Sequence, residues 1–62
     1  MIQLTKLDSS PMLVSTNAIK YIEETPDTIV FFLNGDSVVI RESIEEVRKK
    51  AIDFQKDVLR WI

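Results

Sequence analysis

The candidate nucleophiles in this sequence are serines, because the chain contains no cysteine and no histidine. A nucleophilic serine needs an adjacent base, and without histidine only a lysine could take that role. No motif places a lysine suitably beside any of the serines, which are Ser9, Ser10, Ser15, Ser37 and Ser43. Turn and helix-capping roles explain Ser9, Ser10 and Ser43 better. We therefore predict that the chain is not an enzyme and has no catalytic residues.

Two charged clusters could bind a ligand. Glu23, Glu24 and Asp27 lie close together in the sequence, but a calcium loop needs more ligands at set spacing and a central glycine. We interpret them as solvated charges near a strand end, with a contact to a basic partner surface as the functional alternative. The run Arg48-Lys49-Lys50 is interpreted as a solvated helix face, with an anion or phosphate site as the alternative. Because cysteine and histidine are also missing, we predict no disulfide, no metal site and no cofactor.

The length and charge of the chain limit its partners. Its 62 residues form one small domain, residues 1–62, and such a chain buries only about 60% of its unfolded surface. Stability then needs unusually good packing or self-association. The formal net charge of −2 disfavours nucleic acid, since neutralising phosphates requires a basic face. No apolar run approaches the roughly 20 residues that cross a bilayer, and the N-terminal segment reaches a charge too early for a signal peptide. We expect a cytoplasmic protein without membrane insertion.

The residue pattern predicts strands over roughly residues 1–41 and one helix over roughly 43–61. This corresponds to an α+β fold, a small antiparallel β-meander of four to five strands followed by one C-terminal amphipathic helix. The strongest local signal is Asn34-Gly35, which suits the two-residue loop of a type I′ hairpin. Such a loop would pair Phe31 with Val38, and Val30 with Val39.

The predicted register makes both faces of this hairpin apolar. One face would carry Ile29, Phe31, Leu33, Val38 and Ile40. The other would carry Val30, Phe32 and Val39. A single helix can cover only one of them, so the second face would lack a partner within the chain, and exposed apolar patches of this kind usually mark an interface.

The predicted helix begins with a capping box formed by Ser43 and Glu46. Its apolar residues recur at alternating steps of three and four, at Ile44, Val47, Ala51, Phe54, Val58 and Trp61. Such a helix is about 28 Å long, against about 20 Å for a strand of six residues, so its last turns should extend beyond the sheet. Trp61 fits an oligomer contact or a partner hot spot, and it fits packing over the sheet edge equally well. We predict a homo-oligomer with an interface drawn from Val30, Phe32, Val39, Val58, Leu59, Trp61 and Ile62.

Three segments, taken in order, carry a family resemblance. The chain opens with Met1-Ile2 and continues through an alternating strand to Thr5-Lys6-Leu7. Its centre reads Ile22-Glu23-Glu24-Thr25-Pro26-Asp27-Thr28, followed by a β run and Asn34-Gly35. The third segment is Glu42-Ser43-Ile44-Glu45-Glu46-Val47. Together they resemble the FlbD/SwrD family of small flagellar motility proteins. Members of that family usually have Asn-Gly after the first strand and Asn-Pro before the third, where this chain has Asp8-Ser9-Ser10 and Thr16-Asn17.

The resemblance implies a cytoplasmic accessory protein at the base of the flagellar motor, needed for motor torque or swarming and connected to the stator proteins MotA and MotB. The alternative is a small oligomeric nucleic-acid-binding regulator, because short β-meanders with one C-terminal helix also occur in messenger-RNA binders and in LytTR-type DNA-binding domains. Such a regulator would need its basic residues gathered on one face. These are Lys6, Lys20, Arg41, Arg48, Lys49 and Lys50.

Overall fold

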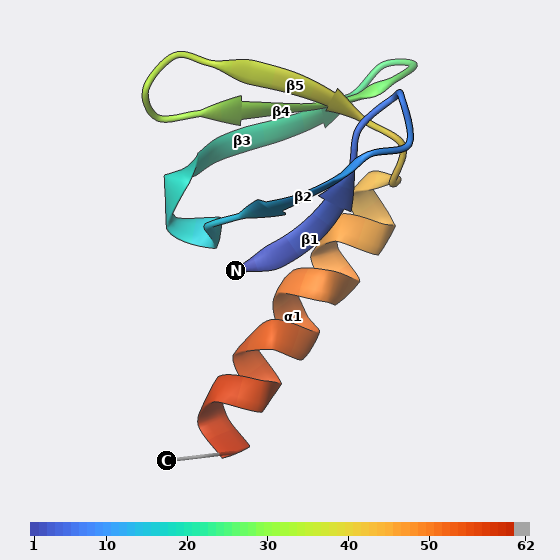
Figure 1. Ribbon diagram of the computed structural model, residues 1–62. Helices are drawn as coiled ribbons and strands as arrows, with labels where there is room; N and C mark the ends of the chain where they lie inside the picture. Colours follow the sequence, from blue (N-terminus) through green and yellow to red (C-terminus); the bar gives the residue numbers. More distant parts are fainter. Residues whose placement is uncertain (61–62) are drawn as a thin grey trace.

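A computed structural model describes residues 1–60, with side chains through residue 56, and contains five strands and one long helix (Figure 1). In chain order the elements are β1 (Ile2–Thr5), β2 (Pro11–Val14), the 3-10 turn η1 (Thr16–Ala18), β3 (Ile19–Glu24), β4 (Thr28–Phe32), β5 (Ser37–Ile40) and α1 (Ile44–Arg60). The predicted α+β class and the order of strands before helix are confirmed. The strands form two small sheets, β1-β2 and β3-β4-β5, and every pair is antiparallel.

The two sheets are joined at one end. An isolated bridge links Lys6 with Ile40, and the Arg41 backbone N–H donates to the Thr5 carbonyl at 2.9 Å. The three-stranded sheet therefore lies over the β1-β2 hairpin, and α1 runs beneath β1 on the other side of that hairpin (Figure 1). This arrangement gives the three-stranded sheet an inner face toward β1-β2 and an outer face away from the rest of the chain.

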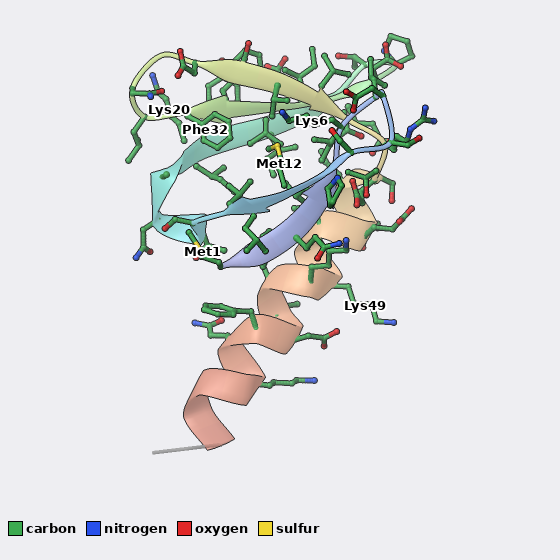
Figure 2. All side chains as sticks on the ribbon, in the orientation of Figure 1. Met1, Lys6, Met12, Lys20, Phe32 and Lys49 are labelled. Carbon is green, nitrogen blue, oxygen red and sulfur yellow. The ribbon has the colours of Figure 1, made fainter. Side chains whose placement is uncertain are left out.

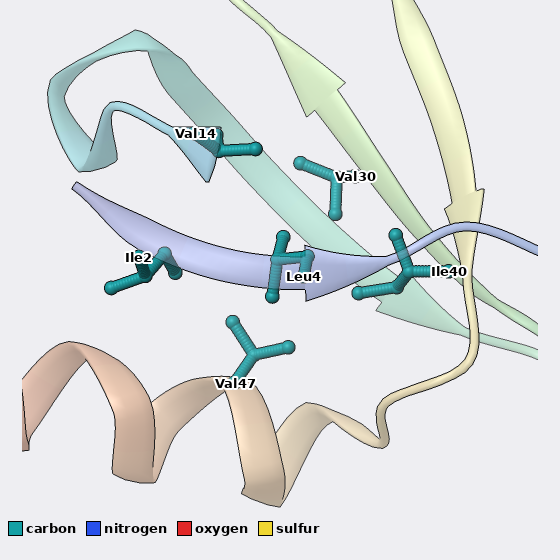
Figure 3. Close-up of a cluster of buried hydrophobic side chains, with 6 residues drawn as sticks. All are labelled: Ile2, Leu4, Val14, Val30, Ile40 and Val47. Atoms are coloured by element: carbon teal, nitrogen blue, oxygen red, sulfur yellow. The ribbon is translucent and has the colours of Figure 1, made fainter. Parts of the chain in front are cut away.

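The hydrophobic core is small and draws one or two side chains from most elements. Its buried members are Ile2, Leu4, Val14, Val30, Ile40 and Val47, and they meet between the sheets and the helix (Figure 3). Leu4 and Val30 are the largest side chains in it that are completely buried. Met12 and Phe32 pack around this cluster from the two sheets (Figure 2). Because burying such a side chain stabilises a fold by about 1.5–3 kcal/mol, six of them give a core of modest strength.

The loops of the β1-β2 and β4-β5 hairpins have the same construction. In the first, Lys6 pairs with Ser10 around Leu7-Asp8-Ser9, and in the second, Phe32 pairs with Asp36 around Leu33-Asn34-Gly35. The third loop residue has a positive φ in both, 72° at Ser9 and 94° at Gly35. The loops are therefore three-residue connections in which a turn is followed by a left-handed residue.

The middle loop residues also act alike. Asp8 accepts the Ser10 backbone N–H at 3.0 Å, and Asn34 accepts the Asp36 backbone N–H at 2.9 Å. Asp8-Ser9 thus does in the first hairpin what Asn34-Gly35 does in the second. Asp8-Ser9 stands where the family usually has Asn-Gly, and in this chain it forms the same kind of loop as Asn34-Gly35.

The predicted two-residue loop at Asn34-Gly35, and the register that followed from it, were wrong. Because the loop contains a third residue, Val30 lies opposite Val38 instead of Val39, and Thr28 lies opposite Ile40. A shift of one residue moves every side chain of one strand to the other face relative to its partner. The inner face therefore combines Thr28, Val30, Phe32, Val38 and Ile40. The outer face combines Ile29, Phe31, Ser37 and Val39.

Helix α1 begins where two polar side chains accept hydrogen bonds from its first backbone N–H groups. The Ser43 hydroxyl accepts the Glu46 backbone N–H at 3.1 Å, as the capping box predicts. The Glu46 carboxylate bonds the Ser43 hydroxyl at 3.2 Å, instead of the expected Ser43 backbone N–H. Glu24, at the end of β3, accepts the Ile44 backbone N–H at 2.8 Å. The last turns of α1 extend beyond the strands, which confirms the predicted overhang (Figure 1).

Candidate functional site

The three segments that carry the family resemblance meet at one end of the molecule. Thr5 comes from the first segment, Glu24 from the second, and Glu42 and Ser43 from the third. Glu42 accepts the Thr5 backbone N–H and the Thr5 hydroxyl, both at 2.9 Å, while Glu24 bonds the start of α1. We call this group the strand–helix junction (Thr5, Glu24, Glu42, Ser43). Its hydrogen bonds hold β1, β3 and α1 together.

Glu42 is the buried charge of this junction. Its side chain is only 7% exposed and also accepts a hydrogen bond from Lys50 Nζ at 3.1 Å. Burial by itself raises the pKa of Glu42, but the hydrogen bonds from the Thr5 amide, the Thr5 hydroxyl and Lys50 outweigh it and lower the pKa to about 2. The carboxylate is therefore ionised at neutral pH and occupied by partners, so it is suited to holding the fold and not to proton transfer.

Lys50 differs from its two neighbours in the basic run. It is half-buried, and its Nζ donates to the Gln3 carbonyl at 2.7 Å as well as to Glu42. Arg48 and Lys49 are exposed, and Arg48 pairs with Glu45 at 3.4 Å. The predicted solvated face holds for Arg48 and Lys49. For Lys50 it was wrong, because β1 passes close enough to the helix to provide the Gln3 carbonyl, and Glu42, just before the helix, provides a second acceptor.

A polar hollow of about 270 Å³ adjoins the junction. It is lined by Leu7, Glu24, Pro26, Asp27, Thr28, Ile40, Arg41, Ser43 and Glu46. Arg41 closes one side by donating to the Leu7 carbonyl. Within the part of the chain that the structure describes, no group of three or more His, Cys, Asp or Glu residues is placed to hold a metal ion. In that same part, every buried side-chain polar atom has a hydrogen-bond partner.

The outer face of the three-stranded sheet is the first apolar surface. Tyr21 and Phe31 lie opposite each other on β3 and β4, and their rings stack with centroids 4.5 Å apart. Ile29 and Val39 are paired neighbours on the same face and are half-buried, while Tyr21 is 45% exposed. We call these four residues the outer sheet face (Tyr21, Ile29, Phe31, Val39).

The second apolar surface is a groove between α1 and β3. Its volume is about 400 Å³, and it is lined by Ile2, Thr16, Ile19, Tyr21, Ile22, Ile44, Val47, Arg48 and Ala51. An adjoining hollow continues along the helix to Phe54 and Gln55, because Thr16 and Ala51 line both. We call the two together the α1–β3 groove.

The edges formed by β2 and β3 are poor binding sites by comparison. Strand β2 begins at Pro11, which has no backbone N–H to donate. Strand β3 has an irregular register between Ile19 and Tyr21, which leaves Lys20 out of the ladder, and Glu23 is exposed on it. A proline, a bulge and edge charges are the usual means of preventing strand addition. Partner contacts are therefore better sought on the faces than on these two edges.

The predicted interface residues fall into four groups. Val39 lies on the outer sheet face, as a surface role requires. Val30 is 0% exposed and Phe32 packs against the core, so the expectation that these two share an uncovered face with Val39 was wrong for the register reason given above. Val58 and Leu59 belong to α1, but their side chains lie outside the described part of the structure. Trp61 and Ile62 lie outside the described residues altogether.

The sequence reasoning missed Tyr21, Ile29 and Phe31 as one exposed surface, although each lies in a predicted strand. It also missed the burial of Glu42. The outer face depends on the length of the loop between β4 and β5. That length fixes the register, and the register decides which side chains of the two strands point toward the β1-β2 hairpin. For Glu42, local sequence offers no signal, because its main partner is Thr5, which lies in another segment of the chain.

Comparison with known proteins agrees with the pattern of the three segments. A family model, FlbD, described as flagellar and swarming motility proteins, matches residues 1–59. Neither the curated proteins nor the solved structures contain a significant match to the chain. The matched range includes the strand–helix junction, the outer sheet face and the α1–β3 groove.

Proposed function

Because this chain belongs to the FlbD family of flagellar and swarming motility proteins, we propose that it is a non-enzymatic accessory of the bacterial flagellar motor. Its role is to support motor power and swarming through the stator proteins MotA and MotB. It acts in the cytoplasm at the motor base, as an oligomeric interaction module. The observation that carries this proposal is the family match over residues 1–59, which spans all five strands and nearly all of α1.

The surface chemistry of the chain supports an interaction role. Its buried polar groups, Glu42 and Thr28, serve the fold, and the junction carboxylate is held by three hydrogen bonds from Thr5 and Lys50. In contrast, Tyr21 and Phe31 present a stacked aromatic pair on the outer sheet face. Exposed contiguous apolar surface of this kind is typical of protein–protein contacts. Within residues 1–60, no helix is long and apolar enough to span a membrane, so contact with a membrane-embedded stator would be made from outside the bilayer.

The nucleic-acid alternative finds no support in the arrangement of the basic residues. Lys6, Lys20 and Lys49 lie in three separate places, the first two near opposite ends of the sheets and the third on the helix (Figure 2). Lys50 is engaged with Glu42. The gathered basic face that binding to phosphates requires is therefore missing from the described side chains.

The proposal is tested in a strain that lacks the gene for this chain. We expect normal filament numbers with reduced motor torque and reduced swarming, both restored by the wild-type gene. Complementation with Leu4→Asp, which places a charge in the completely buried core, should fail and serves as the negative control. Loss of filaments would instead place the protein in flagellar assembly. Unchanged filaments and torque would overturn the proposal.

A further inference from the structure

The outer sheet face points away from both the β1-β2 hairpin and α1 (Figure 1). Phe31 lies on the middle strand of the sheet and stacks on Tyr21, so an aromatic pair lies near the centre of this face. Ile29 and Val39 extend the apolar surface beside that pair. Tyr21 is 45% exposed, and the other three side chains are half-buried. Apolar surface with an aromatic centre is typical of a protein–protein interface.

Strand β3 places one charge at each end of this face. Glu23 lies opposite Ile29 in the register, close to the loop that leads to β4, and it is exposed. Lys20 lies at the other end of β3, near the loop between β4 and β5, where the register shifts between Ile19 and Tyr21 (Figure 2). Because Ile19 packs against the core and Lys20 is exposed, the extra residue of this bulge lies with Tyr21 on the outer side.

A face with opposite charges at its two ends is complementary to a second copy of itself turned end for end. In such a pair the two-fold axis lies between the sheets and runs across the strands, so the facing strands are antiparallel. Strand β3 then lies over β3 of the second copy, which brings Lys20 of each copy near Glu23 of the other. Strand β4 lies over β4, and Phe31 of each copy meets Ile29 of the other. The two-fold symmetry forms each of these pairs twice.

We propose that two copies of this chain associate through their outer sheet faces about this two-fold axis, with antiparallel strands and with Lys20 of each copy paired with Glu23 of the other. The product is a β-sandwich of two three-stranded sheets about 10 Å apart. The inference rests on the proposed function for the existence of an oligomer, and it adds the surface and the symmetry.

The other two-fold arrangement of the same faces, with the axis along the strands, is unfavourable. Strand β3 would then lie over β5 of the second copy. The Glu23 carboxylate would face Val39, and Lys20 would face Ser37. A charge that faces an apolar side chain loses hydration and gains no partner in return. The positions of the two charges therefore select the antiparallel arrangement.

The area of the face sets the strength of the dimer. Its four apolar residues and two charged residues are far fewer than the roughly 20–30 residues that each partner contributes to a standard interface. The monomer also keeps a hydrophobic core of its own. We therefore expect a weak, reversible dimer with a dissociation constant on the order of 10–100 μM.

Sedimentation equilibrium of the purified chain, over a concentration series up to about 1 mM, should show a monomer–dimer equilibrium. Phe31→Ala and Val39→Asp should each weaken dimerisation about 10-fold or more, the loss typical of a central interface residue. Leu13→Asp adds the same charge as Val39→Asp at an exposed apolar site on β2, and it should leave dimerisation unchanged. Circular dichroism verifies that each variant is folded.

Reversing the charges tests the pairing without touching the apolar surface. Lys20→Glu and Glu23→Lys each place like charges opposite one another twice in the dimer, and each should weaken it about 3- to 10-fold. The double variant that combines both changes should regain wild-type affinity. Because exposed charges are screened by salt, the differences should shrink at high ionic strength. Lys49→Glu, an equal charge change on the exposed side of α1, should have no effect.

Crosslinking tests the direction of the strands. The chain has no cysteine, so single cysteines can be introduced at chosen positions. In the antiparallel dimer Ser37 of one copy lies over Val39 of the other. A mixture of Ser37→Cys and Val39→Cys should therefore react with a short bismaleimide crosslinker faster than either variant does alone. Equal rates in all three samples would contradict the antiparallel pairing.

A protein that stays monomeric up to about 1 mM would overturn the inference. So would a dimer that is insensitive both to Val39→Asp and to the charge reversals. Either result leaves the motility proposal standing, because that proposal is decided by torque and filament number in the deletion strain. Conversely, normal torque in that strain would leave the dimer standing.

Discussion

Thr5 and Glu42 are separated by 37 positions in the sequence, yet they are joined by two hydrogen bonds of 2.9 Å, one from the Thr5 backbone N–H and one from its hydroxyl. Lys50 completes the group by donating to the same carboxylate at 3.1 Å. These contacts connect the last residue of β1 to the segment that precedes α1. Because only six apolar side chains are buried in the described part of the chain, these contacts are a substantial part of what positions the helix.

Glu42→Gln should lower the free energy of unfolding at neutral pH by about 2–3 kcal/mol, because it removes the charge from hydrogen bonds in a buried site. The wild-type pKa of about 2 lies below the ordinary value of 4.5. The stabilisation is therefore fully present above about pH 4.5 and is lost as the pH falls towards 2, amounting to about 3 kcal/mol in all. Urea unfolding at a series of pH values measures it.

The exposed Glu45→Gln is the matched control for this change and should retain the wild-type slope of stability against pH. Glu42→Gln should reduce that slope between pH 2 and 4.5. Equal slopes in wild type and Glu42→Gln would show that the carboxylate is not held as described.

Ser9→Gly should stabilise the protein by about 0.5–1 kcal/mol. Ser9 has a φ of 72°, a conformation that costs a residue with a side chain about 1–2 kcal/mol, partly offset by the greater freedom of glycine in the unfolded chain. Thermal unfolding measures the effect. Gly35→Ala, at the equivalent position of the second loop with a φ of 94°, should destabilise it. A lower melting temperature for Ser9→Gly would contradict the shared loop geometry.

Val30→Asp and Val39→Asp should have opposite outcomes, because the register places them on opposite faces of the sheet. Val30 is 0% exposed, and an unpaired charge at that position should prevent folding. Val39→Asp should fold, at a cost of about 1 kcal/mol or less in the monomer. Circular dichroism shows whether each variant folds, and urea titration measures its free energy of unfolding. If Val30→Asp folded and Val39→Asp did not, the register would be that of the two-residue loop.

Periodicity was sufficient for the helix and for the order of the strands. The alternation of Ile2 and Leu4 with Gln3 and Thr5, and the capped row from Ile44 to Phe54, each have one physical interpretation. Asn34-Gly35 has two interpretations, because both the two-residue and the three-residue loop accept a glycine with positive φ. The choice depends on which side chains the other sheet and the helix bury, and that is a property of the whole fold.

The junction could not be predicted for a related reason. In the sequence, Glu42 resembles any acidic residue near a helix start. Such a residue interacts favourably with the helix dipole while its side chain stays exposed to water. Its burial follows from the approach of β1, which supplies Thr5, and from the reach of Lys50 along α1. The first contact spans 37 positions of the sequence, and the second spans eight and depends on how the segment before α1 turns into the helix. The apolar residues at positions 58–62 were predicted to form an interface, and that stays a prediction because their side chains lie outside the described part.

The most direct test of a motor role is the torque of single flagellar motors, measured from the rotation of beads attached to filament stubs, in the deletion strain and in the same strain carrying the wild-type gene. We predict motors with normal filament number that rotate with lower torque without the gene and regain full torque with it. Full torque in the absence of the gene would contradict the account.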